Sequence, residues 1–187
     1  LNRSSDLDGC VLCLWVPSSL LQEGLDTMKA WGFTQKQTYI WAKTKKEPMS
    51  TILKEAKKLV KLEPLKVFGD ILKKVIDKAD LANLMLAFGM GRLFRQTHEI
   101  CLIGINNNGI YKKLANKSQR SVTFAENFGH SIKPETLQDS LELMFPGTEM
   151  LEVFARRNRA GWTCIGNECP PTFGEDIRDS IQKLINV

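Results

Sequence analysis

Residues 130–168 constrain the fold most, because they combine a helical pattern, a β-prone pattern and a polar segment in a fixed order. Lys133-Pro134-Glu135 predicts a helix start, because proline is tolerated in the first turn and an acid there stabilises the positive end of the helix dipole. Apolar residues follow at helical spacing, at Leu137, Leu141 and Met144. A Pro-Gly pair directly afterwards predicts the end of this helix.

Residues 150–154 are apolar and β-prone, and they predict a short buried strand that a single acid, Glu152, interrupts. Arg156 and Asn158 stand just past its C-terminal end. In open α/β sheets ligands collect at the carboxyl ends of strands. A carboxylate there can accept hydrogen bonds from ribose hydroxyls, and an amide can pair with an adenine edge or a carboxylate. An ion pair between Glu152 and a neighbouring arginine explains the same pattern equally well.

The order of four sequence blocks in this stretch resembles that of a known protein family. Four blocks follow one another: His130-Ser-Ile-Lys-Pro-Glu135, Pro146-Gly147, Leu151-Glu-Val-Phe-Ala-Arg-Arg157 and Gly161-Trp-Thr-Cys-Ile-Gly-Asn-Glu168. Together they resemble the C-terminal signature of the MT-A family of adenine-N6 methyltransferases. That family contains the catalytic subunit of the messenger-RNA adenosine methyltransferase and many bacterial and phage DNA enzymes. The Phe-Ala-Arg and Gly-Asn-Glu blocks are closer to the bacterial and phage type.

The resemblance implies an α/β fold with a Rossmann-like methyltransferase sheet that is mostly parallel, with helices on both faces. It implies S-adenosylmethionine as the cofactor. By the same resemblance Lys133 would meet the methionine carboxylate of that cofactor. The residues that would surround its ribose and adenine are Glu152, Phe154, Arg156, Asn158, Asn167 and Glu168.

The 187 residues suffice for one methyltransferase domain spanning the whole chain, and they contain no run of about 18 apolar residues that would span a membrane. The polar start of the chain lacks a signal-peptide pattern, and an intracellular location, cytoplasmic or nuclear, is expected. Cys10 and Cys13 lie in a strand-like run that would point them to opposite faces. With only two histidines besides, no metal site is expected.

The first half of the chain predicts three further elements: a strand over residues 11–16, a helix over 20–31 and a strand over 33–42. Trp15 and Trp31 are interpreted as core residues. Strands are also predicted near residues 97–105 and 121–126, and a last helix near 175–185. The order of the tryptophan-bearing segments is again similar to the MT-A family.

Residues 44–88 predict an inserted lobe of two or three short helices. Between Lys43 and Lys78 there are 11 lysines against 5 acids, so the positive charge of the chain concentrates there. Such a lobe would bind a phosphate backbone, or its lysines would simply solvate an amphipathic helix. A glycine-rich turn with two arginines follows, and by resemblance it covers the adenine pocket. The predicted nucleic-acid contacts are Lys43, Lys45, Lys46, Arg92 and Arg95.

The implied reaction is methyl transfer to the exocyclic amine of adenine in nucleic acid, with DNA preferred over RNA. MT-A enzymes use an Asp-Pro-Pro-Trp motif or a close variant, which this chain lacks. Its one double proline, Pro170-Pro171, follows a cysteine and precedes a threonine. The catalytic motif is therefore expected upstream of Leu1. The alternative is a methyltransferase-like subunit that is inactive itself and binds nucleic acid or supports an active partner. A homodimer or a heterodimer with another methyltransferase subunit is left open.

Overall fold

The computed structural model describes residues 9–62, 69–70, 73, 81–87, 89–91, 93–127, 129 and 132–186. The chain divides into two compact units. We call Val11–Asn106 with Arg120–Thr136 the sheet unit. The remainder, Leu1–Cys10, Asn107–Gln119 and Leu137–Val187, is called the C-terminal unit. The prediction of one domain over the whole chain stays a prediction.

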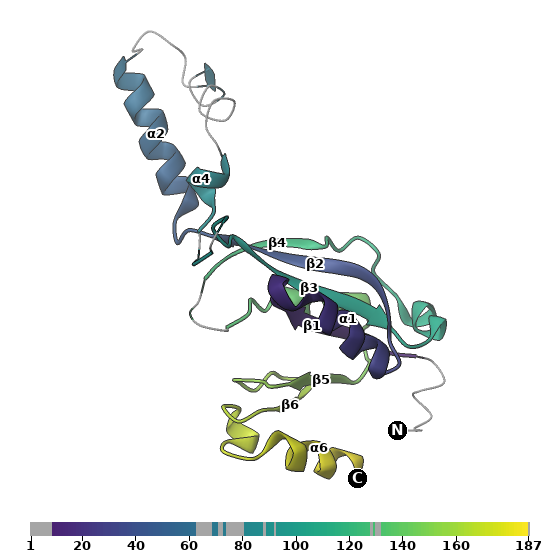
Figure 1. Ribbon diagram of the computed structural model, residues 1–187. Helices are drawn as coiled ribbons and strands as arrows, with labels where there is room; N and C mark the ends of the chain where they lie inside the picture. Colours follow the sequence, from purple (N-terminus) through teal and green to yellow (C-terminus); the bar gives the residue numbers. More distant parts are fainter. Residues whose placement is uncertain are drawn as a thin grey trace. The chain divides into compact units, whose positions relative to one another are not determined.

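The sheet unit is built on four strands in the order β1-β3-β2-β4 (Figure 1). Their bounds are β1 Val11–Val16, β2 Thr34–Thr44, β3 His98–Ile105 and β4 Val122–Glu126. β3 runs antiparallel to both of its neighbours, whereas β4 pairs in parallel with β2. Two of the three pairings are thus antiparallel, and the expectation of a mostly parallel sheet is wrong for the described strands.

The physical reason lies in where β3 inserts. β1 and β2 run in the same direction, since each is antiparallel to β3, and helix α1, Leu21–Ala30, connects them. A helical crossover is what parallel strands require. β3 nevertheless returns between these two strands and becomes the neighbour of each, which makes both pairings antiparallel.

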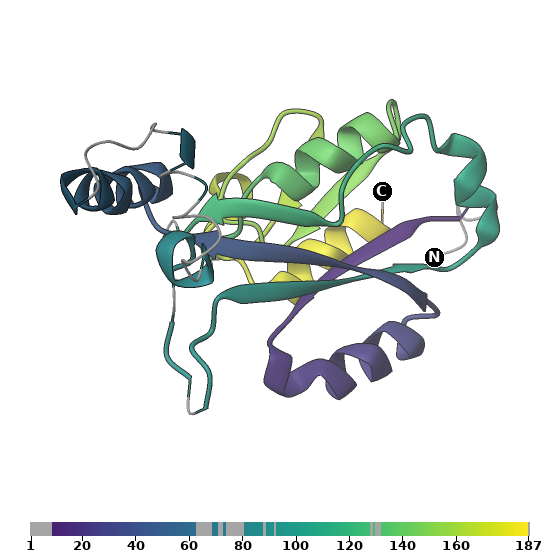
Figure 2. The same cartoon turned by 90° about the horizontal axis from the view of Figure 1, so that it is seen from above.

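Helix α1 packs on this sheet (Figure 2). The residues that make this contact are small or flexible. Met28 is buried with Val16 and Leu102 in one cluster. A Cβ added to Gly24 would lie 2.7 Å from a methyl group of Val16, so the close approach of helix and strand needs glycine there. Trp31, just past the helix, is 58% exposed, and its interpretation as a core residue is wrong. A helix layer on the other face stays a prediction.

The lobe contains helix α2, Pro48–Leu62, and the short helix α4, Leu81–Met85. Ile52 and Ala56 are buried on one side of α2. The two ends of the lobe meet, because Thr44 and Leu86 form an antiparallel bridge. Much of the predicted helical pattern between residues 63 and 80 lies outside the described residues.

Helix α5, Thr136–Met144, belongs to the C-terminal unit from Leu137 onward. The same unit contains strands β5, Met150–Val153, and β6, Trp162–Ile165, and helix α6, Ile177–Ile185 (Figure 1). α5 and β5 confirm the predicted helix and strand to within a few residues. β5 is not buried as predicted, since Leu151 is 53% exposed and Val153 37% exposed. The reason is that, among the strands of the described residues, β5 pairs only with β6.

None of the helices in the described part of the chain has both the length and the hydropathy that a membrane-spanning helix requires. None of the five cysteines, all of which are among the described residues, forms a disulfide.

Candidate functional site

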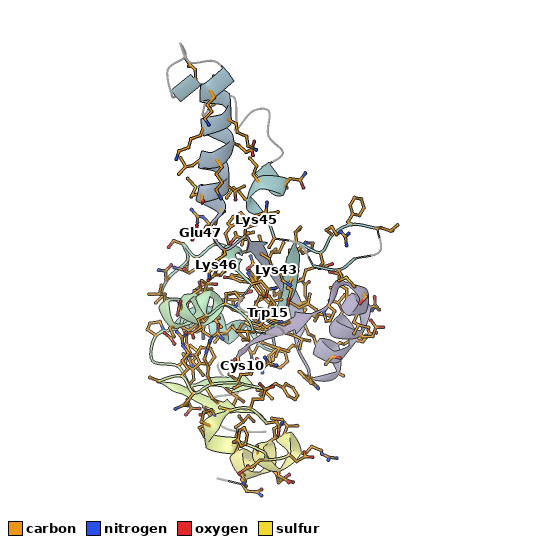
Figure 3. The ribbon with its side chains drawn as sticks, turned by 90° about the vertical axis from the view of Figure 1, so that its left-hand side faces the viewer. Cys10, Trp15, Lys43, Lys45, Lys46 and Glu47 are labelled. Carbon is orange, nitrogen blue, oxygen red and sulfur yellow. The ribbon has the colours of Figure 1, made fainter. Side chains whose placement is uncertain are left out.

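Two clusters of polar side chains stand out, one in each unit. In the sheet unit, Glu99 lies on β3 and two ammonium groups hold its carboxylate. Lys133 Nζ is 2.6 Å from Oε2, and Lys43 Nζ is 2.8 Å from Oε1. Each lysine also contacts an aromatic ring, Lys43 over Trp41 at 5.0 Å and Lys133 over Trp15 at 5.8 Å from the ring centroid. Figure 3 labels Lys43 and Trp15 of this cluster. The cluster therefore carries one net positive charge beside two indole faces.

The electrostatics of Glu99 result from opposing effects. Burial raises the pKa of its carboxyl, but hydrogen bonds and charge from Lys133 and Lys43 outweigh burial and lower that pKa below 4.5. Glu99 is therefore ionised at neutral pH, and only one of the two lysine charges is compensated. An ionised acceptor, an ammonium donor and aromatic faces together can bind a polar aromatic ligand.

Neighbouring side chains fix this cluster in place. Trp41 is almost completely buried, and its Nε1 donates a hydrogen bond to the carbonyl oxygen of Ala125 at 2.9 Å. Trp15 meets Tyr39 edge to face at 6.2 Å between ring centroids. The Tyr39 hydroxyl in turn shares a 3.2 Å hydrogen bond with that of Thr136.

In the C-terminal unit, the predicted cofactor residues gather where β5 and β6 end. The two strands are parallel, with Glu152 opposite Cys164, so the C-terminal ends of both strands lie at the same edge of the pair. We call this place the β5–β6 edge. Arg156 and Glu168, one from each exit, form a 3.1 Å ion pair across it. The structure thus brings together residues from two separate blocks of the sequence.

Backbone conformation at this edge is tightly determined. Phe154 is the one residue other than glycine with a positive φ among the described residues, at 63°, and its side chain is 72% exposed. Opposite it, a Cβ added to Gly166 would lie 2.2 Å from the carbonyl oxygen of Ala155. Only glycine permits that approach of the two backbone segments. A 2.9 Å hydrogen bond from Ala155 N to the carbonyl oxygen of Ile165 holds them together.

The double proline beside this edge forms a structural turn. Pro170–Thr172 is a 3-10 turn, and the buried Cys169 thiol before it donates to the carbonyl oxygens of Arg157 and Cys164. Burial raises the pKa of Cys169, and the nearby Cys164 and Glu152 add to that effect. This thiol is therefore an unreactive neutral group, and the turn supplies no carboxylate to the edge.

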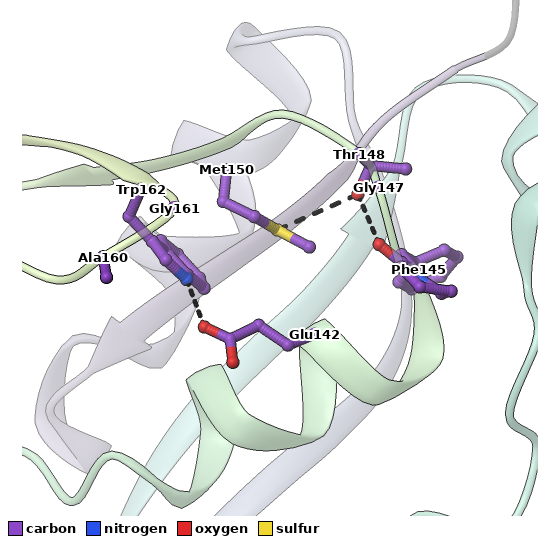
Figure 4. A pocket seen from close by; sticks show the side chains of 9 residues that line it. Glu142, Phe145, Gly147, Thr148, Met150, Ala160, Gly161 and Trp162 are labelled. Carbon is purple, nitrogen blue, oxygen red and sulfur yellow. Dashed lines mark hydrogen bonds between the residues drawn. The ribbon is translucent and has the colours of Figure 1, made fainter.

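A second group of charges in this unit is structural. Arg159 Nε donates to Glu142 at 2.7 Å. Trp162 Nε1 donates to the same carboxylate at 2.6 Å, a bond that Figure 4 shows. These bonds lower the pKa of Glu142, the Arg159 contact contributing most. Glu142, Met150 and Trp162 border a pocket of about 240 Å³. Because α5 and the β5–β6 loop both contribute, the bonds fix that loop to the helix.

The remaining predicted residues are placed as follows. Lys133 belongs to the sheet unit, where it pairs with Glu99. Asn158 and Asn167 are exposed in the loops after β5 and β6. Among the predicted nucleic-acid contacts, Lys43 is engaged by Glu99, and Lys45 Nζ donates to the carbonyl oxygen of Asn83.

Two more of these contacts, Lys46 and Arg95, are exposed, whereas Arg92 lies outside the described residues. Glu99, Arg159 and Glu142 were not predicted as site residues. For Glu99 a signal existed, because an acid heads an otherwise apolar strand.

Comparison with known proteins adds the deciding observation: the MT-A70 family profile matches residues 71–168, slightly more than half of the chain. The chain belongs to the MT-A70 family. This match ends at Glu168 and contains Glu99, Lys133 and the β5–β6 edge. The MT-A70 assignment agrees with the resemblance found in the four sequence blocks, and it supports a methyltransferase-like protein of the general adenosine-N6 kind.

Two curated relatives are similar to this MT-A70 chain. One is the probable N(6)-adenosine-methyltransferase MT-A70-like of Oryza sativa subsp. japonica, 26% identical over 86% of this chain and 18% of the relative. The other is the N(6)-adenosine-methyltransferase MT-A70-like protein of Drosophila melanogaster, 23% identical over 86% of this chain and 21% of the relative. The chain thus spans about a fifth of the length of the curated relatives it matches.

Proposed function

We propose that this MT-A70 protein binds S-adenosylmethionine through the β5–β6 edge and serves methyl transfer to the exocyclic amine of adenine in nucleic acid. The observation that carries the proposal is the convergence of Phe154, Arg156 and Glu168 at one edge of a parallel strand pair. Ligands collect at such edges in α/β proteins. The relatives are named as N(6)-adenosine-methyltransferases, which supports the reaction class.

The residues at the edge suit a nucleoside. Phe154 offers an exposed aromatic face on which an adenine can stack. Glu152 and Glu168 are acceptors for ribose hydroxyls, and the amide of Asn167 can donate and accept. The absence of a Cβ at Gly166 keeps the two strand exits close together. A left-handed phenylalanine is costly, and such strain is common where a ligand binds.

When bound, the cofactor supplies an electrophilic methyl group on a positively charged sulfur. The protein's part is to align the adenine amine with that methyl group and to accept a hydrogen bond from the amine, because its lone pair is delocalised into the ring. Within the sheet unit, Glu99 is a carboxylate that its two lysine partners hold ionised, the form that such an acceptor requires.

Calorimetric titration with S-adenosylmethionine tests the cofactor proposal. Asn167→Ala is expected to weaken binding about tenfold, since hydrogen bonds in a desolvated site contribute about 1–2 kcal/mol. The fold should be unchanged, because it is the backbone oxygen of Asn167 that bonds Gly174 N. Lys133→Ala should also weaken binding. Gln182→Ala, an exposed change on α6, is the matched control. Unchanged affinity in both site variants would exclude the proposed cofactor contacts.

The nucleic-acid substrate is tested separately. We propose DNA over RNA, on the Phe-Ala-Arg and Gly-Asn-Glu blocks, while the names of both relatives refer to adenosine. Binding and methyl transfer are measured with adenine-containing duplex DNA and with RNA of the same sequence. Tighter binding of RNA, or methylation of RNA alone, would overturn the DNA preference.

One observation favours the alternative of an inactive subunit. The double proline of this chain forms an exposed 3-10 turn after a buried thiol and brings no carboxylate, so it cannot act as the catalytic motif. An inactive subunit would bind nucleic acid or an active partner without binding S-adenosylmethionine. Heat on titration with the cofactor therefore supports the enzyme, and its absence with retained nucleic-acid binding supports the alternative.

A further inference from the structure

The segment just before β3 is a narrow hairpin whose tip is apolar. Gly89 and Gln96 form an antiparallel bridge, with Gly89 N donating to the carbonyl oxygen of Gln96 at 2.8 Å. Met90 is 93% exposed, Leu93 94% and Phe94 89%. Leaving each of them in water forgoes about 1.5–3 kcal/mol relative to burial, so such a group marks an interaction surface. We call these three residues the hairpin tip.

The backbone of this hairpin is held by a close turn and by hydrogen bonds at its base. A Cβ on Gly91 would lie 2.0 Å from the carbonyl oxygen of Phe94, so the turn closes to a degree that only glycine allows. At the base, the Gln96 side chain donates to the Ser18 hydroxyl at 3.2 Å and to the carbonyl oxygen of His98 at 2.8 Å. The base is therefore fixed to the sheet unit while the tip presents its apolar side chains.

Charge and shape together select the partner. Residues 86–97 include two arginines and no acid, a composition that suits a polyanion. A stable protein interface buries about 800 Å² on each partner, which three side chains on one turn do not supply. Proteins that open DNA insert such apolar wedges, commonly Phe, Leu or Met, between adjacent base pairs.

We propose that the hairpin tip is a wedge that enters the base stack of duplex DNA beside the target adenine, with Phe94 stacking on the exposed neighbouring base. The inference rests on the proposed function, because adenine inside a duplex must leave the stack before its amine can react. Unstacking costs a few kcal/mol, and an aromatic side chain against a base returns about 1–3 kcal/mol. The wedge thus offsets the cost of extruding the adenine.

The test uses a 24-base-pair duplex, about the length of two helical turns, with one 2-aminopurine opposite an abasic site. This weak point admits a wedge whatever the recognition sequence. We expect the protein to bind it about tenfold more tightly than the fully paired duplex and to raise the 2-aminopurine fluorescence several-fold. Phe94→Ala and Leu93→Ala should lose both effects, and Phe94→Trp should retain them. Phe173→Ala, an equally exposed aromatic elsewhere, is the control.

Each outcome decides between alternatives. If Phe94→Ala and Leu93→Ala keep the preference and the fluorescence rise, the wedge is wrong. If they change only self-association in sedimentation, a second copy of the chain occupies the tip instead, and the wedge is again wrong. The same samples are titrated with S-adenosylmethionine. Retained cofactor binding without a wedge effect overturns the wedge and leaves the proposed function standing. A wedge effect without cofactor binding overturns the proposed cofactor binding, and absence of both effects overturns both proposals.

Discussion

At the scale of single residues, Phe154 is the most unusual position in the chain. A side chain in the left-handed region costs about 1–2 kcal/mol, and nothing in the local sequence demands it. Phe154 does not repay that cost by burial, since its ring is 72% exposed. Backbone strain at an exposed aromatic residue, close to a carboxylate and an arginine, is typical of a ligand-binding residue. A residue that only packs in the core would not show it.

This predicts opposite effects of Phe154→Gly on stability and on binding. Glycine removes the steric strain but adds backbone entropy to the unfolded chain, so the free energy of unfolding should change by less than about 1 kcal/mol. Cofactor affinity should fall severalfold, because the stacking face is removed. Urea unfolding and calorimetry on the same sample measure both. Equal losses of stability and affinity would mean that the ring only supports the fold.

Glu99 gives a prediction about pH. Its folded-state pKa lies below the unfolded value of 4.5, so its ion pairs stabilise the fold fully above that pH. That contribution is lost as the pH falls through the lower folded-state pKa. Glu99→Gln should cost about 1–3 kcal/mol at pH 7, because it leaves two half-buried lysines without their acceptor.

Denaturant titrations of wild type and Glu99→Gln at several pH values between 7 and 3 measure this. We expect the difference between the two proteins to shrink as the pH falls below 4.5. A matched control is Glu55→Gln, whose carboxylate pairs with Lys58 at the surface of α2. A pH-independent difference for Glu99→Gln would show that shape, not charge, explains its cost.

Single-residue roles were partly accessible from the sequence. Arg156 and Glu168 were named as neighbours of one ligand, and they form an ion pair. The left-handed Phe154 and the need for glycine at position 166 were not accessible, because both arise from the approach of two strand exits. Trp31 was misassigned because an aromatic residue at the end of a helix is buried or exposed according to the turn that follows. The residue type alone does not determine that turn.

At the scale of elements, α2 separates its faces clearly. Ile52 and Ala56 are buried, and Lys54, Lys57 and Lys61 are exposed, spaced so that they share the opposite side. This amphipathic division explains the lysines without any ligand. It also leaves a row of ammonium groups in water, where a phosphate backbone could neutralise them.

We therefore predict that replacing Lys54, Lys57 and Lys61 by Gln reduces the slope of log K against log salt by about 0.9 for each phosphate that these lysines no longer neutralise. Binding of duplex DNA is measured between about 50 and 200 mM salt, the range over which such ion pairs change affinity. The same change at Lys29 and Lys36, two lysines outside the lobe, is the control. A slope that all variants share would assign the α2 lysines to solvation alone.

Element boundaries were well predicted where a periodic pattern met a turn signal, as at α5 and at the β1–α1 junction. Pairing was not, because β3 inserts between β1 and β2 although it lies far from both along the chain. Strand β6 was also missed. Its four residues, Trp162–Ile165, were recognised as a motif, and a run that short gives no periodicity from which a strand could be inferred.

At the scale of the whole molecule, ligand binding should appear as stability. A cofactor that binds only the folded chain raises the free energy of unfolding by about 2.7 kcal/mol at a concentration 100 times its dissociation constant. We predict such an increase with S-adenosylmethionine in urea unfolding, and none with methionine alone. A transition that S-adenosylmethionine leaves unmoved would place the chain among the inactive, non-binding members of its family.

The meeting of the two ends of the lobe has a consequence for the history of this protein. Thr44 bridges Leu86, and Lys45 N donates to the carbonyl oxygen of Met85 at 2.9 Å, so the chain enters and leaves the lobe at one point. A segment with adjoining ends can be gained, lengthened or exchanged by a lineage without moving a strand, since closing a long loop costs only slightly more than closing a short one. Substrate preference can in this way diverge at the lobe while the rest of the protein is inherited intact.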